Sequence, residues 1–169
     1  MNRHGYNGLC RYNQSGGFNV PFGRYKKTYF PEKELLFFAE KAKKATFVCK
    51  PYQKLFQYLR DDDVLYCDPP YGRVKNDDGT MGNKQISEAG YNAFWKKDDD
   101  QRLYDYLKLI DESGSSFMVS GVLRHDDKTC WMLDKLISDG YNYKVLSFDY
   151  NKVSRKGKKE TTEVIIKNY

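Results

Sequence analysis

The sequence predicts an α/β fold in which a mostly parallel sheet carries helices on both faces and ends in an antiparallel hairpin. Three observations predict it. Helix-like and strand-like segments alternate along residues 31–167, as in parallel sheets covered by helices. The run Val64-Leu65-Tyr66-Cys67 is apolar on both faces, which is typical of a buried parallel strand. The last two strand-like segments are joined by a short basic turn.

The first half of the chain begins with an irregular segment. Residues 1–30 are rich in Gly, Asn and aromatic residues and show no period of 3.6 or 2, so we expect loops. Pro31 opens a helix whose first turn carries Glu32 and Glu34, since proline and acidic residues both favour a helix N-terminus. Residues 46–49 predict a short buried strand, and residues 51–59 predict one or two helical turns.

The second half alternates strands and helices. The strand at residues 64–67 is followed by a mixed, Gly-containing segment at 72–90, which predicts a mobile loop. Asp98 is expected to cap a helix that runs to about Glu112, and residues 117–119 predict a strand. A helix over residues 131–137 ends at Gly140. Strands near residues 143–150 and 162–167 flank the basic turn at 152–159.

Composition and charge narrow the class of protein. Hydrophobic residues make up 40% and charged residues 31% of the 169 positions, as in globular proteins. Residues 1–60 hold twelve Lys/Arg and three Glu, a balance of +9, whereas residues 61–169 have a balance of −3. A polyanionic partner for the first part is therefore expected; a solvated Lys-rich face is the alternative.

The cysteines and the hydropathy pattern exclude other classes. The four cysteines are scattered without a Cys-x-x-Cys pair, so we expect no metal and no disulfide framework. The sequence contains no apolar run of membrane-spanning length and no secretory h-region. We therefore expect the protein to stay where it is made.

The tetrad Asp68-Pro69-Pro70-Tyr71 carries the chemistry. Two prolines make a stiff bend, so that the Asp68 carboxylate and the Pro69 carbonyl can accept both hydrogens of an exocyclic amino group. That arrangement aims the nitrogen lone pair at an electrophilic methyl group and stabilises the positive charge that develops. An ordinary proline-rich turn is the alternative, but the aromatic residue and the preceding apolar strand favour catalysis.

The tetrad resembles the catalytic motif of amino-group DNA methyltransferases. Residues 2–27 (NRHGYNGLCRYNQSGGFNVPFGRYKK) resemble the target-recognition region of the Dam family of DNA adenine-N6 methyltransferases, the D12 class of phage and bacterial type. The similarity continues through residues 29–31 and the tetrad and, more weakly, through residues 91–95, the strand at 117–120 and the closing hairpin. It implies a Rossmann-like sheet that uses S-adenosylmethionine to methylate N6 of a flipped adenine in double-stranded DNA, usually within GATC.

The resemblance also implies roles for individual residues. The tetrad residues Asp68, Pro69, Pro70 and Tyr71 would form the catalytic turn, with Asp68 also contacting the donor and Tyr71 stacking on the adenine. The residues implied to contact DNA are Tyr6, Asn7, Leu9, Arg11, Asn13, Pro21, Arg24, Lys26 and Lys27. An arginine on a rigid loop can read guanine O6 and N7, whereas lysines more often contact phosphates. Tyr91, Phe94 and Trp95 either line the adenine pocket or anchor a helix.

Two features depart from the family pattern. The Phe-x-Gly-x-Gly loop and the acidic residue that hold the donor are not found in this sequence, and Ser120-Gly121 stands where relatives often carry Ser-Asn. We therefore expect residues 1–30 to be the rear of the recognition segment and residues 31–169 the C-terminal part of the catalytic domain. Two hypotheses follow: an enzyme fragment that needs a separate donor-binding chain, or a DNA-binding or regulatory remnant that does not methylate. Either would work in the cytoplasm of a bacterial or phage-infected cell.

Overall fold

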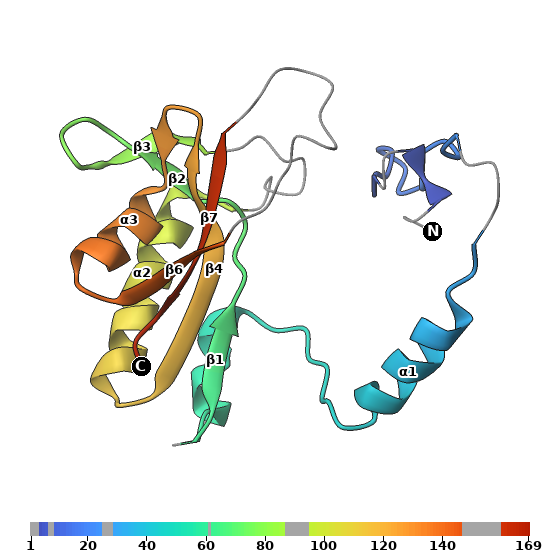
Figure 1. Cartoon of the computed structure of the whole chain (residues 1–169), viewed down its shortest axis with the longest axis horizontal. Helices are drawn as coiled ribbons and strands as arrows, with labels where there is room; N and C mark the ends of the chain where they lie inside the picture. The colour runs from blue at the N-terminus through green and yellow to red at the C-terminus, as the bar shows by residue number, and fades with distance from the viewer. Residues whose placement is uncertain (1–3, 7–8, 25–28, 61, 87–94, 147–159) are drawn as a thin grey trace. The chain divides into compact units, whose positions relative to one another are not determined.

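The computed structural model describes residues 4–6, 9–24, 29–60, 62–86, 95–146 and 160–169. The chain forms two compact units, Met1–Cys49 and Lys50–Tyr169 (Figure 1). Each unit is described by itself. The functional boundary expected near residue 30 remains a prediction.

The first unit begins with the expected loop-rich segment. Isolated antiparallel bridges join Gly5 to Phe22 and Tyr12 to Phe18, so the segment folds back on itself without forming a regular strand. His4 stacks on the Phe22 ring at a centroid distance of 5.8 Å, and its Nε2 accepts the Tyr29 backbone N–H at 2.9 Å. These contacts tie the start of the segment to the residues that lead into the next helix.

The helix predicted after Pro31 is confirmed as α1, Glu32–Ala42. None of its residues is buried, and Leu36, Phe37 and Phe38 are each at least 60% exposed. The strand expected at residues 46–49 is wrong, because these residues have no regular structure and Phe47 is 73% exposed. A strand is stable only where a neighbour completes its hydrogen bonds, and the described residues provide no neighbour there.

The second unit is built on a mixed five-stranded sheet in the order β1-β4-β7-β6, with β5 paired to β4. The strands are β1 (Val64–Cys67), β4 (Ser116–His125), β5 (Lys128–Thr129), β6 (Asn142–Leu146) and β7 (Thr161–Lys167). Among the strands that the structure describes, only the β1–β4 pair is parallel, so the mostly parallel sheet expected from the sequence is wrong. The closing hairpin is confirmed, and its strand β7 lies between β4 and β6 and runs opposite to both. The basic turn expected at 152–159 lies outside the described residues.

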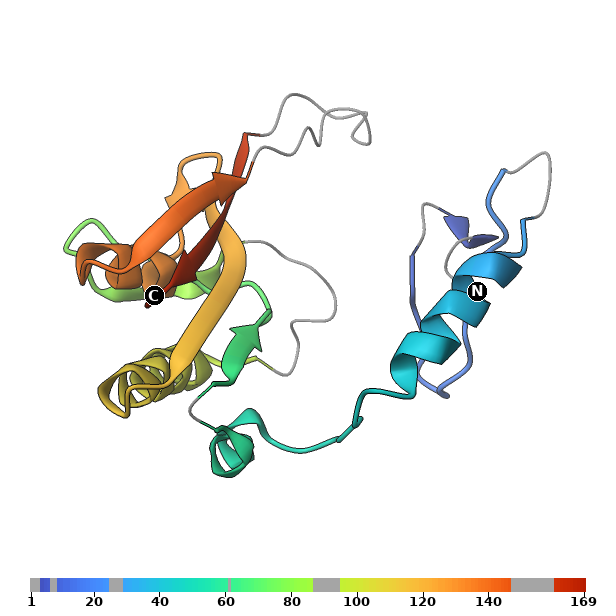
Figure 2. The ribbon, with the colours of Figure 1, turned by 60° about the horizontal axis from the view of Figure 1, so that its bottom comes forward.

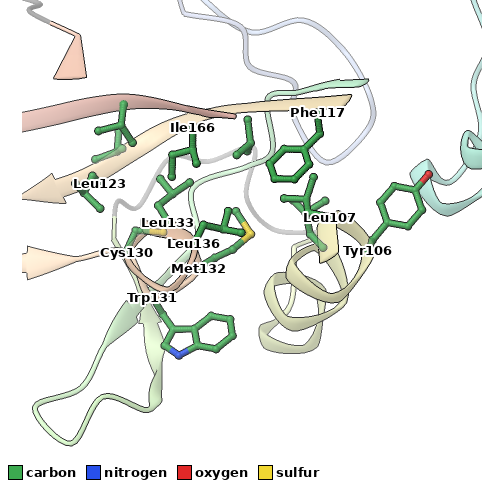
Figure 3. Close-up of a cluster of buried hydrophobic side chains, with 14 of the residues drawn as sticks. Tyr106, Leu107, Phe117, Leu123, Cys130, Trp131, Met132, Leu133, Leu136 and Ile166 are labelled. Carbon is green, nitrogen blue, oxygen red and sulfur yellow. The ribbon is translucent and has the colours of Figure 1, made fainter. Parts of the chain in front are cut away.

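Two helices cover one face of this sheet. They are α2 (Lys97–Glu112) and α3 (Trp131–Ser138). Phe117, Leu123 and Ile166 of the sheet face Leu107 of α2 and several apolar side chains of α3 (Figure 3). Helices on the second face, also expected, are not found among the described residues of this unit. No described helix is long and apolar enough to cross a membrane.

The start of α2 differs from the expectation. Lys96, not Asp98, occupies the N-cap position, and the Asp99 carboxylate accepts the Lys96 backbone N–H at 2.8 Å. The run Asp98-Asp99-Asp100 therefore lies inside the first helical turns, where negative charge stabilises the N-terminus of a helix.

The loop expected at residues 72–90 is largely a β-hairpin instead. Strands β2 (Arg73–Lys75) and β3 (Met81–Gln85) pair antiparallel. Gly79 adopts a φ of 83° in the connecting turn, and Asp78 accepts both the backbone N–H and the hydroxyl of Thr80. Glycine is favoured in this conformation, and the aspartate fixes the turn locally. The regular structure of this segment therefore comes from the residues of its turn, and the mixed composition of the segment did not reveal it.

Gly121 marks a close approach between β4 and α3. A Cβ atom added at this position would lie 3.1 Å from Leu133 Cδ1. A larger side chain would require Leu133 to move. The packing of α3 directly on the strand therefore favours glycine at this position.

The burial of α2 gives a matched test of the core. Leu107 is fully buried, whereas Leu109, two residues later on the same helix, is 58% exposed. We expect Leu107→Ala to lower the free energy of unfolding by about 2–5 kcal/mol, because it removes transfer energy and leaves a cavity. Leu109→Ala should change it by about 0.5 kcal/mol or less. Urea unfolding of the full chain measures both, and equal losses would contradict the described orientation of α2.

Candidate active site

The tetrad begins where β1 ends. Strand β1 runs parallel to β4 (Figures 1 and 2), and Cys67 pairs with Val119. Asp68 therefore emerges beside Ser120, the next residue of β4. The Asp68 side chain is exposed, while Pro69, Pro70 and Tyr71 are half-buried. The prolines and Tyr71 thus pack against the protein, while the Asp68 carboxylate stays accessible. It lies at the carboxyl end of the strand, where α/β sheets bind ligands.

A hydrogen-bonded chain leads to the carboxylate. The Tyr66 and Ser120 hydroxyl oxygens lie 2.8 Å apart, and the Ser120 hydroxyl donates to Asp68 Oδ1 at 3.4 Å. Sequence reasoning gave no role to Tyr66 and noted Ser120 only as part of the Ser120-Gly121 departure from the family pattern. The signal that would have found them is the pairing of two parallel strands, which brings their carboxyl ends to the same edge.

An apolar pocket of about 270 Å³ lies against the first three residues of the tetrad. Its walls come from β1, from the 3-10 turn Tyr52–Lys54 and its neighbour Leu55, and from α2. Trp95 also lines it, and its indole N–H donates to Asp100 of α2 at 3.2 Å, so the geometry does not decide between the two roles left open for this residue. Tyr91 and Phe94 lie outside the described residues. In the described parts of the chain, no group of three His, Cys, Asp or Glu side chains is arranged to hold a metal ion.

The backbone that leaves the tetrad packs on a buried carboxylate. Asp100, on α2, is 1% exposed and accepts the Arg73 backbone N–H at 3.1 Å and the Trp95 indole N–H at 3.2 Å. A Cβ atom added at Gly72 would lie 2.8 Å from Asp100 Oδ1 and 2.9 Å from Cys130 Sγ. No sequence signal distinguished Asp100, because it is the last of three consecutive aspartates that read as a solvated helix start.

The first unit holds the residues implied to contact DNA, and it brings two of them together. The Tyr6 backbone N–H donates to the Pro21 carbonyl at 2.9 Å, across the fold of the loop segment. Tyr6 and Leu9 are 47% and 49% exposed, and Pro21 and Arg24 are exposed. Apolar and aromatic side chains on this surface are accessible to a partner.

Two further predicted residues make contacts within their own loop. Arg11 donates from Nε to Asn19 Oδ1 at 2.9 Å and from Nη2 to the Asn19 carbonyl at 3.2 Å. Asn13 Oδ1 accepts the Gly17 backbone N–H at 2.8 Å. The structure therefore shows Asn19 as a residue that orients Arg11, which the sequence did not indicate. Asn7, Lys26 and Lys27 lie outside the described residues.

The chain combines an acidic, proline-rich turn at the end of a parallel strand with an exposed, aromatic loop segment. These features indicate the class of amino-group methyltransferases. The family model for the D12 class N6 adenine-specific DNA methyltransferase matches residues 1–152. The chain belongs to this family.

Several curated DNA adenine methylases are similar to parts of the chain. That of Vibrio cholerae is 53% identical over 121 residues, which are 71% of this chain and 41% of the relative. The retron Ec67 DNA adenine methylase of Escherichia coli is 46% identical over 121 residues, 38% of its length. The DNA adenine methylase of Escherichia coli K12 is 63% identical over 71 residues, which are 42% of this chain and 26% of the relative. The chain thus spans about two fifths of the first two relatives.

The pocket thiol gives a test of the described burial. Burial raises the pKa of Cys67 to about 11 and that of Cys130 to about 12, from an ordinary 9.0. Since the thiolate is the reactive form, two pKa units lower its population at pH 8 by about a hundredfold. Iodoacetamide should therefore modify the exposed Cys10 and Cys49 first, as mass spectrometry of peptides would show. In denaturant all four should react alike, and equal rates in the native chain would contradict the burial of Cys67.

Proposed function

We propose that this chain carries the catalytic turn and part of the DNA-reading surface of an enzyme that methylates N6 of adenine in double-stranded DNA, using S-adenosylmethionine as the donor. The observation that carries the proposal is the intact tetrad at the carboxyl end of β1, with its carboxylate accessible and Ser120 beside it, in a chain that belongs to the D12 class. With DNA as the substrate, the activity belongs in the cytoplasm of a bacterial or phage-infected cell.

In this proposal the tetrad orients the amino group. The Asp68 carboxylate and the Pro69 carbonyl accept its two hydrogens, so that the nitrogen lone pair points at the donor's methyl group. Both acceptors stabilise the positive charge that grows on the nitrogen during transfer. Tyr71 offers its ring for stacking on the base, and the hydroxyl pair of Tyr66 and Ser120 supports the Asp68 side chain. Proton loss follows transfer, so the scheme needs no strong general base.

The loop segment of the first unit would read the DNA. Duplex adenine reaches a catalytic pocket only after flipping, at a cost of a few kcal/mol, and the exposed Tyr6 ring is suited to fill the space left in the stack. Asn19 accepts from Arg11 Nε and Nη2, which leaves N–H groups on both Nη atoms for guanine O6 and N7. The target sequence would be GATC, and Lys26 and Lys27 would contact phosphates of the DNA backbone.

The donor would be held mainly by residues outside this sequence. Asp68 is the one residue here implied to contact it, and the matched part is 41% of the Vibrio cholerae relative. Among the described residues β1 pairs along one edge only, with β4, and its Val64 and Tyr66 side chains are 49% and 58% exposed. We propose that strands of a donor-binding portion, on this or a separate polypeptide, pair with the other edge of β1.

Complementation tests the catalytic role of the tetrad. This chain with the donor-binding portion of a relative should methylate GATC duplex, measured with labelled S-adenosylmethionine. Asp68→Ala should lower the rate at least about 100-fold while leaving assembly intact, because an acceptor for the amino group is lost. Asp77→Ala, which removes an exposed aspartate of the β2–β3 turn, is the matched control. Near-parental turnover by Asp68→Ala would contradict the proposal, and DNA binding without methylation by the parent would favour the regulatory alternative.

Binding to DNA tests the reading role of Arg11. Arg11→Ala should weaken binding to GATC duplex by about 1–3 kcal/mol and affect a scrambled duplex much less, because it removes a base contact. Asn19→Ala should reproduce part of this loss, since it frees the guanidinium to rotate. Lys26→Ala should weaken both duplexes similarly and reduce the salt dependence. Fluorescence anisotropy measures all three, and equal losses on the two duplexes for Arg11→Ala would remove it from the reading role.

A further inference from the structure

Asp100 is buried in a way that its neighbours on α2 are not. The Asp98 side chain is 78% exposed, whereas Asp100 is 1% exposed. Each of its two carboxylate oxygens accepts one N–H: Oδ2 that of the Arg73 backbone, Oδ1 that of the Trp95 indole. Arg73 is two residues beyond Tyr71, and Trp95 lines the pocket beside Asp68 and the prolines. One carboxylate therefore links the backbone leaving the tetrad to a wall of the pocket.

The fit between these parts is close. Gly72, between Tyr71 and Arg73, has no room for a Cβ atom against Asp100 Oδ1 and Cys130 Sγ. The Arg73 guanidinium donates to the carbonyls of Asn83 at 2.7 Å and Trp95 at 3.0 Å. Its Nε is buried without a hydrogen-bond partner in the described structure and lies 3.9 Å from Asp100 Oδ2. A shift of Asp100 would therefore displace both Trp95 and the backbone of Gly72 and Arg73, which follows the tetrad.

Burial makes the ionised form of the Asp100 carboxyl group less favourable. Burial, the larger influence, raises the pKa of Asp100 to about 6, while the bonds from Trp95 and Arg73 oppose the rise. The groups that face it are Arg73 from β2, Asp99 on its own helix and the thiol of Cys130 from the segment before α3. Since the folded chain binds this proton more tightly than an unfolded aspartic acid does, ionisation lowers stability as the pH rises through about 6. At neutral pH the group is nevertheless ionised and can accept both N–H groups.

We propose that Asp100 is a positioning residue for methyl transfer, holding the tetrad and the Trp95 wall of the pocket in one geometry. The inference rests on the proposed function. Protonation below pH 6 turns one oxygen into a hydroxyl, which is a weaker acceptor, so that one of the two N–H groups is held less firmly. Asn at this position has the same shape but directs an NH2 group at one of the two donors.

The activity arm compares kcat with KM in the complemented enzyme. Asp100→Asn should lower kcat about 10–100-fold, since small misplacements of reacting groups have effects of this size, and should change the KM for DNA less than about threefold. It should also remove the fall in kcat below pH 6. Asp98→Asn, on the same helical turn and exposed, is the control and should behave as the parent. Parental kcat with an unchanged pH profile in Asp100→Asn would overturn the inference.

A second arm needs no activity. The chain has two tryptophans, so Trp131→Phe leaves Trp95 as the reporter. Its emission in the isolated chain should titrate with a midpoint near pH 6, and the titration should vanish with Asp100→Asn. A featureless parental titration overturns the inference even if Asp100→Asn fails to fold. Failure of the proposed function is distinguishable: there the parent complex and its Asp68→Ala variant show the same turnover, whatever Asp100 does.

Discussion

The parallel pairing of β1 with β4 is the constraint on which the rest of the second unit depends. It joins a four-residue strand to the long central strand and fixes the register Cys67 to Val119. A slip of one residue would exchange the faces of β1, moving Leu65 out of the core and Asp68 away from Ser120. The pocket walls, the hydroxyl chain and the direction of the backbone into Gly72 all follow from this register.

The two sides of the tetrad are held by different kinds of interaction. Before it, Tyr66 and Ser120 provide an exposed polar chain that leaves the Asp68 carboxylate accessible. After it, a buried carboxylate and close packing around Gly72 leave little freedom. A turn that is fixed at its exit and accessible at its entry suits a group that must accept a substrate without rearranging. Preorganisation of this kind is how polar sites stabilise developing charge.

Local signals predicted the elements that local chemistry determines. The apolar run at 64–67 became β1, Pro31 preceded α1, and the closing strands became the β6–β7 hairpin. The direction of β7 against β4 and the missing strand at 46–49 were not predicted, because each depends on which neighbour is present. The hairpin at 73–85 was missed for a different reason: its turn is fixed by Asp78, Gly79 and Thr80, and the mixed composition of the segment did not reveal this. The tetrad was identified from its own residues, whereas Ser120, Asn19 and Asp100 stand out only through the side-chain contacts that the fold gives them.

Gly121 shows how one close contact couples two positions that are distant in the sequence. Leu133 Cδ1 lies 3.1 Å from the place that a Cβ atom at residue 121 would take. A larger side chain at residue 121 therefore requires Leu133 to move within the interface between β4 and α3. Loss of volume at residue 133 alone would leave a cavity. Because the two residues are in contact, the effects of substitutions at them on stability should not simply add.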